Sequence, residues 1–400
     1  MEGAIALIII GALAFLSQET GRAFGKFRIP SVVGYVILGI ILGKSFLNIL
    51  NPYFVDKLSL INDLALGVIA FIIGGELNLR RLRRLGKSIL TIAIFESLGA
   101  FLFVILLTYI FTKNIYFSII LGAISSATAP AATVAVINQY RARGPLTTTI
   151  LGVVGIDDAI ALIIYTFAST VCLSSFLHIH SSLLQVSLHS VETILFSILG
   201  GALFGIVLGY LLKSLKTKEE IFGFVLAFIL LGEGIAMHLH LSELLFVMSM
   251  AFVVNNLSLR KTNSAIESLN TLGFPLIATF FALAGTHLDI KLLPLIGGVG
   301  MVYFFARILG KTTGAYLGAK IFSAPRVVQK YVGFSLWPQI GVAIALAIMV
   351  KKDFGHLGEE GFQLAQLAVN ILLFTTIFTE ILGPLMTKFS LEKAGEIKVR

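Results

Sequence analysis

The sequence predicts an all-α polytopic membrane protein with about thirteen transmembrane helices. Hydrophobic residues make up 57% of the chain and charged residues only 13%, whereas soluble domains carry about 25% charged residues. Mean hydropathy is +0.96. Apolar stretches of about the length that crosses a bilayer recur from one end of the chain to the other. In lipid such stretches satisfy their own backbone polar groups by forming helices.

Polar loops separate the apolar stretches, so each stretch is assigned to one helix. The Met1 end carries Glu2 and lacks a basic leader, so the first stretch is predicted to be a helix and not a cleaved signal peptide. Only a short tail follows the last stretch. We therefore expect a single membrane unit over 1–400, without a soluble regulatory domain. The predicted segments are 3–19, 29–43, 58–76, 88–111, 115–139, 146–172, 191–212, 220–238, 241–257, 270–287, 292–319, 331–350 and 361–387.

Basic residues are concentrated in every second loop. Cytoplasmic loops of membrane proteins carry an excess of Lys and Arg. This pattern places the N-terminus outside and the C-terminus in the cytoplasm of a prokaryotic-type plasma membrane. The net charge of +9 then reflects loops at a bilayer surface, and we expect no nucleic-acid partner. The loops of the basic side contain Arg22, Lys26, Arg28, Arg80, Arg81, Arg83, Arg84, Lys87, Arg141, Arg143, Lys213, Lys216, Lys218, Arg260, Lys261, Lys320, Arg326 and Lys330.

Two segments are predicted to be broken near their centres. Segment 115–139 contains Pro130, and segment 331–350 contains Pro338 followed by Gly341. Proline removes a backbone donor and clashes with the preceding turn. Non-helical backbone at membrane depth is tolerated only inside protein or beside a cavity. Interrupted helices at matching places in two halves indicate the binding site of a secondary transporter.

The spacing of the two breaks also predicts an inverted repeat. They lie seven segments apart, and an odd offset gives the two segments opposite orientations. Segments one to six would then match segments eight to thirteen, with segment 191–212 linking the halves. Inverted repeats of this kind are common in secondary transporters.

Asp157 and Asp158 lie side by side in the otherwise apolar segment 146–172. A carboxylate at the bilayer centre costs about 2.5–3.5 kcal/mol by insertion scales. Neighbouring helix positions point about 100° apart, so one structural partner would rarely satisfy both acids. One carboxyl group can bind a cation when ionised or a proton when neutral. The pair therefore predicts an ion or proton site.

Segment 292–319 carries two basic residues, Arg307 and Lys311. Arginine stays protonated in proteins, so Arg307 needs a partner, and Asp157 is the nearest candidate. Lys311 lies one turn further along the same face. It either releases a proton during transport or extends toward the cytoplasmic surface. We expect the second arrangement, and with it the exchange of one proton per cation.

Other residues in the segments fit structural roles better. Glu96 and Glu233 could lie on a proton path, but we expect hydrogen-bonded structural acids. Two sets of glycines at four-residue spacing are typical of close helix packing. These sets are Gly201, Gly205 and Gly209, and Gly310, Gly314 and Gly318.

Several motifs resemble the monovalent cation:proton antiporters of the NapA and Kef type. The aspartate pair lies in the run GIDDA at 155–159, which resembles the paired-aspartate motif of that branch. Together with two broken helices this is the most specific part of the resemblance, which covers essentially the whole chain. The other matching runs are IPSVVGYVILGIILG at 29–43, FIIGGELNL at 71–79, FFALAG at 280–285 and ARILGK at 306–311.

The resemblance implies a fold and a mechanism. The NhaA/NapA-like fold has a core domain with crossed broken helices, here about 88–172 and 292–387, which moves as an elevator. A dimerisation or scaffold domain, about 1–87 and 191–290, would form a homodimer. By similarity, Asp158 exchanges the cation for protons, Asp157 assists it, and Thr128 contacts the cation through its backbone or hydroxyl group.

The chain also departs from neighbouring branches of this superfamily. Ala129 stands where NhaP-like members have an acid between the Thr and the Pro of the broken helix. Val154 and Gly155 occupy the turn where those members often have a glutamate. Val342 follows Gly341 where Kef-type members often have Gly-Glu. The resemblance therefore does not select the ion.

Three functions are compatible with these residues, and none of them is an enzymatic activity. The first is exchange of Na⁺, with Li⁺ as surrogate, for H⁺. The alternatives are K⁺/H⁺ exchange of the Kef type and Na⁺-coupled symport of an organic solute. We expect no cofactor and no metal beyond the transported monovalent cation. An intramembrane aspartyl protease is disfavoured because its acids come from separate helices.

Overall fold

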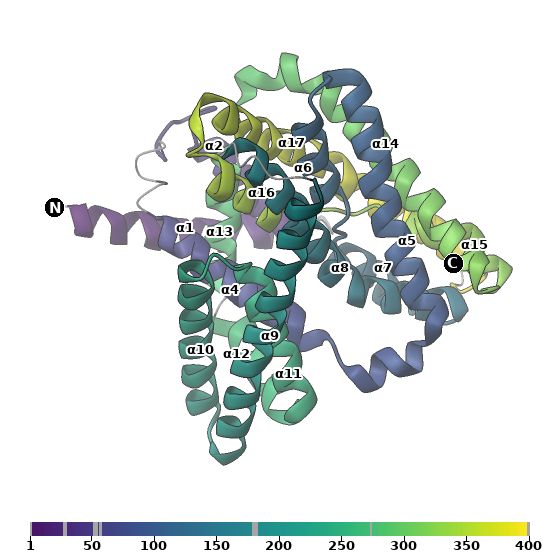
Figure 1. The fold of residues 1–400 in the computed structure, drawn as a ribbon, viewed down its shortest axis with the longest axis horizontal. Helices are drawn as coiled ribbons and strands as arrows, with labels where there is room; N and C mark the ends of the chain where they lie inside the picture. The colour runs from purple at the N-terminus through teal and green to yellow at the C-terminus, as the bar shows by residue number, and fades with distance from the viewer. Residues whose placement is uncertain are drawn as a thin grey trace. The chain divides into compact units, whose positions relative to one another are not determined.

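The computed structural model describes residues 2–26, 30–50, 55, 58–177, 183–272 and 274–397, and in these residues the chain is helical without any strand (Figure 1). The helices form two compact units. Unit 1 comprises Met1–Arg22, Gly34–Arg83 and His180–Thr286. Unit 2 comprises Ala23–Val33, Arg84–Ile179 and His287–Arg400.

Unit 1 is built around one short, buried helix. This helix, α11, packs against both α4 and α9, and α10 and α12 pack against it as well (Figure 1). Glycines allow the close approach, because a Cβ at Gly201 would overlap the carbonyl oxygen of Phe246 and one at Gly74 would overlap that of Met248. The helices are α1 (Glu2–Lys26, whose last residues belong to unit 2), α2 (Ser31–Leu42, whose first residues belong to unit 2), α4 (Ser59–Glu76), α9 (Leu183–Ser214), α10 (Lys218–His238), α11 (Glu243–Leu257), α12 (Leu259–Leu272) and α13 (Phe274–Gly285).

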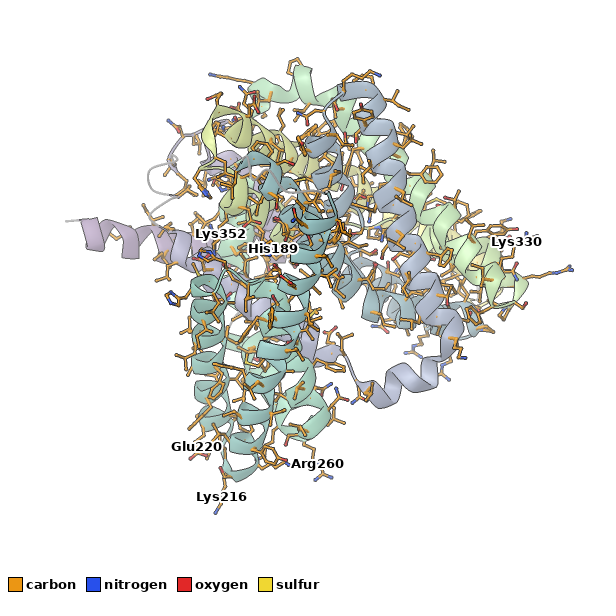
Figure 2. The ribbon with its side chains drawn as sticks, in the orientation of Figure 1. His189, Lys216, Glu220, Arg260, Lys330 and Lys352 are labelled. Carbon is orange, nitrogen blue, oxygen red and sulfur yellow. The ribbon has the colours of Figure 1, made fainter. Side chains whose placement is uncertain are left out.

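A capping box fixes the start of α10. The hydroxyl of Thr217 accepts a hydrogen bond from the Glu220 backbone at 3.2 Å, and the Glu220 carboxylate accepts one from the Thr217 backbone at 3.2 Å. Both bonds satisfy donors that a helix start leaves open. Lys216, Glu220 and Arg260 lie together at this end of unit 1 (Figure 2).

Unit 2 contains every broken segment that the prolines predict. Its helix α5 is itself interrupted at Gly86, whose φ of 80° is rarely adopted by residues with a side chain. Its elements are α5 (Leu79–Thr112, whose first residues belong to unit 1), α6 (Ile115–Ser125), α7 (Pro130–Gln139), α8 (Pro145–Phe176), η1 (Ile290–Leu292), α14 (Leu293–Ile321), α15 (Arg326–Tyr331), η2 (Val332–Leu336), α16 (Gly341–Phe354) and α17 (Gly358–Lys393).

The length and apolar composition of the chain's helices are those of an integral membrane protein. Six helices among the described residues are long and apolar enough to cross a membrane, or up to eight if each bent pair forms one span. The thirteen predicted segments include shorter helices: α2 has 12 residues and α11 has 15. A perpendicular crossing needs about 20 residues. The count of thirteen therefore stays a prediction.

The glycines of α14 confirm the predicted close helix packing. A Cβ at Gly310 would overlap the carbonyl oxygen of Gly99, and one at Gly314 would overlap that of Phe95. Gly318 has the backbone of Ile92 at 2.8 Å from the position of its missing Cβ. Three successive turns of α14 thus lie against the backbone of α5, the helix that carries Glu96.

Replacing Gly314 by alanine is expected to lower thermal stability, because the new methyl group meets backbone and not a movable side chain. Overpacking of this kind costs about 1–3 kcal/mol. The matched control is Gly297→Ala on the same helix, where a Cβ would have no atom within 4 Å. Unfolding temperatures of the two detergent-purified variants measure the difference, and equal temperatures would contradict the packing.

Candidate functional site

Both predicted breaks are present in unit 2. The first lies between α6, which ends at Ser125, and α7, which begins at Pro130. The second lies between η2, which ends at Leu336, and α16, which begins at Gly341, with a bend of 48°. Pro130 occupies the first turn of α7, where its missing N–H would have had no helical partner.

The two breaks contact each other directly. The backbone N–H of Ala129 donates to the carbonyl oxygen of Pro338 at 2.9 Å. The amide of Gln339 donates from Nε2 to the carbonyl oxygen of Ile124 at 2.9 Å. The hydroxyl of Thr133 donates to the carbonyl oxygen of Ser335 at 3.0 Å. Backbone groups that unwinding frees from one segment are therefore satisfied by the other.

Arg307 of α14 holds the breaks together. The side chain is fully buried, with 0% of its surface exposed. Its Nε donates to the carbonyl oxygen of Ser125 at 3.0 Å, and Nη2 donates to that of Ala127 at 2.9 Å. On the other break, Nη1 donates to the carbonyl oxygen of Trp337 at 2.6 Å, and Nη2 to that of Pro338 at 3.3 Å.

The prediction that Asp157 is the partner of Arg307 is wrong. The rigid guanidinium fork presents five N–H donors, and four backbone carbonyls from the two breaks take them. These carbonyls lie at the carboxyl ends of short helices, where the helix dipole is negative. The buried positive charge is thus stabilised by oriented dipoles, and Asp157 is left for another cation.

That cation is Lys311, which corrects the expectation that its side chain extends to the membrane surface. Lys311 is fully buried, and its Nζ lies 2.6 Å from Glu96 Oε2 and 3.4 Å from Asp157 Oδ2. It also donates to the carbonyl oxygen of Ser126 at 2.7 Å and to Thr128 Oγ1 at 2.5 Å. An ammonium group has three donors, so four oxygen atoms compete for them, and Asp157 is the most distant.

The acids of the cluster come from α5 and α8. Ser97 lies within reach of both Asp157 Oδ1, at 2.7 Å, and Glu96 Oε1, at 3.0 Å. A hydroxyl has one proton to donate, so Ser97 serves one carboxylate at a time. Asp157 is 0% exposed and Asp158 is 8% exposed. Both acids are therefore buried, and Asp158 is slightly less so than Asp157.

Sequence reasoning missed several residues of this site. Ser97 is not predicted at all, and Glu96 is predicted to have a structural role, although it is the acid closest to Lys311. Gln339 links the second break to two further groups: its amide lies 2.9 Å from the Tyr303 hydroxyl, and its backbone N–H donates to Glu380 at 3.1 Å. The available signal was the acid itself, because Glu96 and Glu380 each interrupt a long apolar run.

The arrangement is suited to exchanging small cations. Carboxylates, a threonine hydroxyl and carbonyls freed by unwinding are oxygen ligands, which hard cations prefer. Two carboxylates compete for one lysine, and a third carboxylate lies beside them. A carboxylate oxygen can bind either a cation or a proton, so the two would compete for the same oxygen atoms.

Comparison with known proteins agrees with this chemistry. The sequence model of the family "Sodium/hydrogen exchanger, transmembrane" matches residues 8–393. The Na(+)/H(+) antiporter NhaS4 of Synechocystis is 24% identical over 406 residues, which cover 96% of this chain and 95% of that protein. The ammonium/H(+) antiporter subunit AmhT of Alkalihalophilus pseudofirmus is 22% identical, and the match covers 92% of each chain.

The fold has solved counterparts as well. The sodium proton antiporter MjNhaP1 of Methanocaldococcus jannaschii superposes with a TM-score of 0.79 and 20% sequence identity, covering 98% of this chain and 99% of that one. The relatives are named as antiporters, which are transporters and not enzymes. The chain belongs to the sodium/hydrogen exchanger family, within the monovalent cation:proton antiporter superfamily.

Proposed function

We propose that the chain exchanges Na⁺ for H⁺ through Asp158, which binds the cation and the proton in turn. The observation that carries the proposal is the buried cluster of acids and Lys311 at the contact between two broken helices. Asp158 is the slightly less buried acid of the pair, which supports its assignment as the acid that receives the cation. Asp157 and Thr128 complete the set of side-chain oxygen ligands.

Lys311 acts as the internal competitor of the cation. With Glu96 at 2.6 Å and Asp157 at 3.4 Å, it holds Asp157 more loosely. A cation arriving at Asp158 can draw Asp157 away while Lys311 keeps its bond to Glu96. Proton binding to the aspartates reverses the change. This exchange of partners at the site needs only small movements of side chains inside unit 2, whereas access to the two sides of the membrane needs a larger movement.

We assign alternating access to an elevator movement of the core, 88–172 and 292–387, against the scaffold, 1–87 and 191–290. All the site residues and both breaks belong to unit 2, which supports a single moving body. The thirteen helices with an inverted repeat of six, the outside N-terminus, the plasma-membrane location and the homodimer belong to the same proposal. Mass measurement of the protein in lipid nanodiscs tests the dimer, and a monomeric mass would remove it.

Purified protein in liposomes that enclose a pH-sensitive dye tests the proposed exchange. We expect the lumen of acid-loaded vesicles to become alkaline when Na⁺ or Li⁺ is added. K⁺ and NH₄⁺ are tested in the same way, NH₄⁺ because the relative AmhT is named for it. Two results together would establish the symporter instead. No cation would drive proton movement over a broad pH range, and Na⁺ would drive the uptake of an organic solute.

The burial of Lys311 leads to a prediction on stoichiometry. A buried lysine beside two acids can release a proton when a cation takes its partner, so we expect more than one H⁺ per cation and dependence on membrane potential. Lys311→Ala should lower the ratio toward one. Reversal potentials in liposomes measure it, with Lys330→Ala as control, since Lys330 is exposed on α15 (Figure 2). A ratio of one in the unchanged protein would restore the electroneutral expectation.

A further inference from the structure

The start of α8, the helix that carries both aspartates, is capped by a residue from the other end of the chain. Gly144 precedes the helix and has no side chain to cap it. Instead the Glu396 carboxylate accepts hydrogen bonds from the backbone N–H of Leu146 at 2.7 Å and of Thr147 at 2.7 Å. The Thr147 hydroxyl donates to the same carboxylate at 2.6 Å.

The backbone around Glu396 is shaped for this contact. Gly395 has a φ of 70°, which turns the chain back after α17. The Glu396 N–H donates to the carbonyl oxygen of Leu391 at 3.0 Å, and its carbonyl oxygen accepts from the Arg143 N–H at 3.3 Å. A Cβ at position 144 would overlap the Glu396 carboxylate. The absence of a side chain at Gly144 therefore makes room for the carboxylate.

The contact links the start of α8 to the end of α17, a helix that also lies against the second break. Near the second break, α17 packs on Pro338 through Gly383, and Glu380 accepts the Gln339 N–H at 3.1 Å. At its end, α17 leads through Gly395 to the carboxylate that caps α8. A carboxylate at a helix N-terminus is stabilised by the open N–H groups and by the helix dipole.

We propose that Glu396 is a positioning residue for cation binding, which acts by fixing α8 along its axis. Thr147 lies eleven positions before Asp158, which corresponds to about 16 Å along a helix. A shift or fraying at the capped end changes the contacts of Asp157 with Ser97 and Lys311, at 2.7 and 3.4 Å. The inference rests on the proposed function, because it concerns the affinity of that exchange.

The test compares Glu396→Ala and Glu396→Gln with the unchanged protein in the liposome assay. We expect the KM for the cation to rise about fivefold in Glu396→Ala, on the scale of losing a helix cap, with the maximal rate changed by less than about twofold. Glutamine keeps one acceptor and should give a smaller rise. Added formate should restore the KM of the alanine variant by occupying the vacated position. Glu392→Ala, one turn earlier in α17, is the control.

A second measurement is independent of transport. Hydrogen exchange at the amides of Leu146 and Thr147 should be faster in Glu396→Ala and slow again with formate. An unchanged KM together with a lower rate from fewer folded transporters would overturn the proposal, as would unchanged amide protection. If the unchanged protein moves no protons, the proposed function fails, while the amide measurement still decides whether Glu396 holds α8.

Discussion

Replacing Asp158 by asparagine is expected to abolish cation-dependent proton movement in liposomes. The amide keeps the size of the side chain but neither binds a proton at neutral pH nor offers a negative charge to a cation. Removal of a positioned proton-carrying group lowers rates by about a hundredfold or more. Asp157→Asn should retain measurable exchange with altered affinity, since Lys311 keeps Glu96 at 2.6 Å.

The control for this prediction is a second acid in the same unit. Asp353 at the end of α16 accepts hydrogen bonds from the hydroxyls of Tyr165 and Ser169, each at 2.9 Å, and lies outside the cluster. Asp353→Asn should keep cation-dependent exchange. Exchange that persists in Asp158→Asn at the unchanged rate would move the ion site away from the aspartate pair.

Replacing Arg307 by alanine is expected to have the largest effect on stability. The change leaves four carbonyl oxygens of the two breaks without the charged donor that they share. Hydrogen bonds to charged groups contribute about 1.5–3 kcal/mol each, so we expect a loss of at least about 3 kcal/mol. Arg307→Lys should lose less than Arg307→Ala, because an ammonium group still offers three donors to the carbonyl oxygens.

Thermal unfolding of detergent-purified protein measures this effect. The exposed Arg326 at the start of α15 offers a matched arginine, and Arg326→Ala should leave the unfolding temperature nearly unchanged. Equal unfolding temperatures for the two alanine variants would show that the breaks do not depend on the guanidinium group. A folded but inactive Arg307→Ala protein would point to a role in ion binding alone.

The breaks and the acid pair could be predicted because they depend on local chemistry. Proline removes a backbone N–H wherever it occurs, so Pro130 and Pro338 predict unwinding even when the neighbouring helices are unknown. Two adjacent acids in an apolar helix are conspicuous for a similar reason. Short-range rules of this kind predict an ion site, the two broken segments and the helix that carries the acids.

The partners of the charged residues could not be predicted in the same way. Arg307 and Lys311 are one turn apart on α14, and which of them meets Asp157 depends on how α5 and the breaks pack around that helix. The sequence also gives no reason for backbone carbonyls to outcompete a carboxylate for Arg307. Nor does it indicate that Glu396, after the last helix, reaches the start of α8.

Calorimetry of Na⁺ binding to the detergent-purified protein, in buffers with different ionisation enthalpies, tests the central claim most directly. If one carboxylate binds the cation and the proton in turn, binding releases protons, and the apparent Kd for Na⁺ rises as the pH falls. The same titration of Asp158→Asn should show no binding heat. Cation binding that releases no proton and whose affinity does not change with pH would contradict the account.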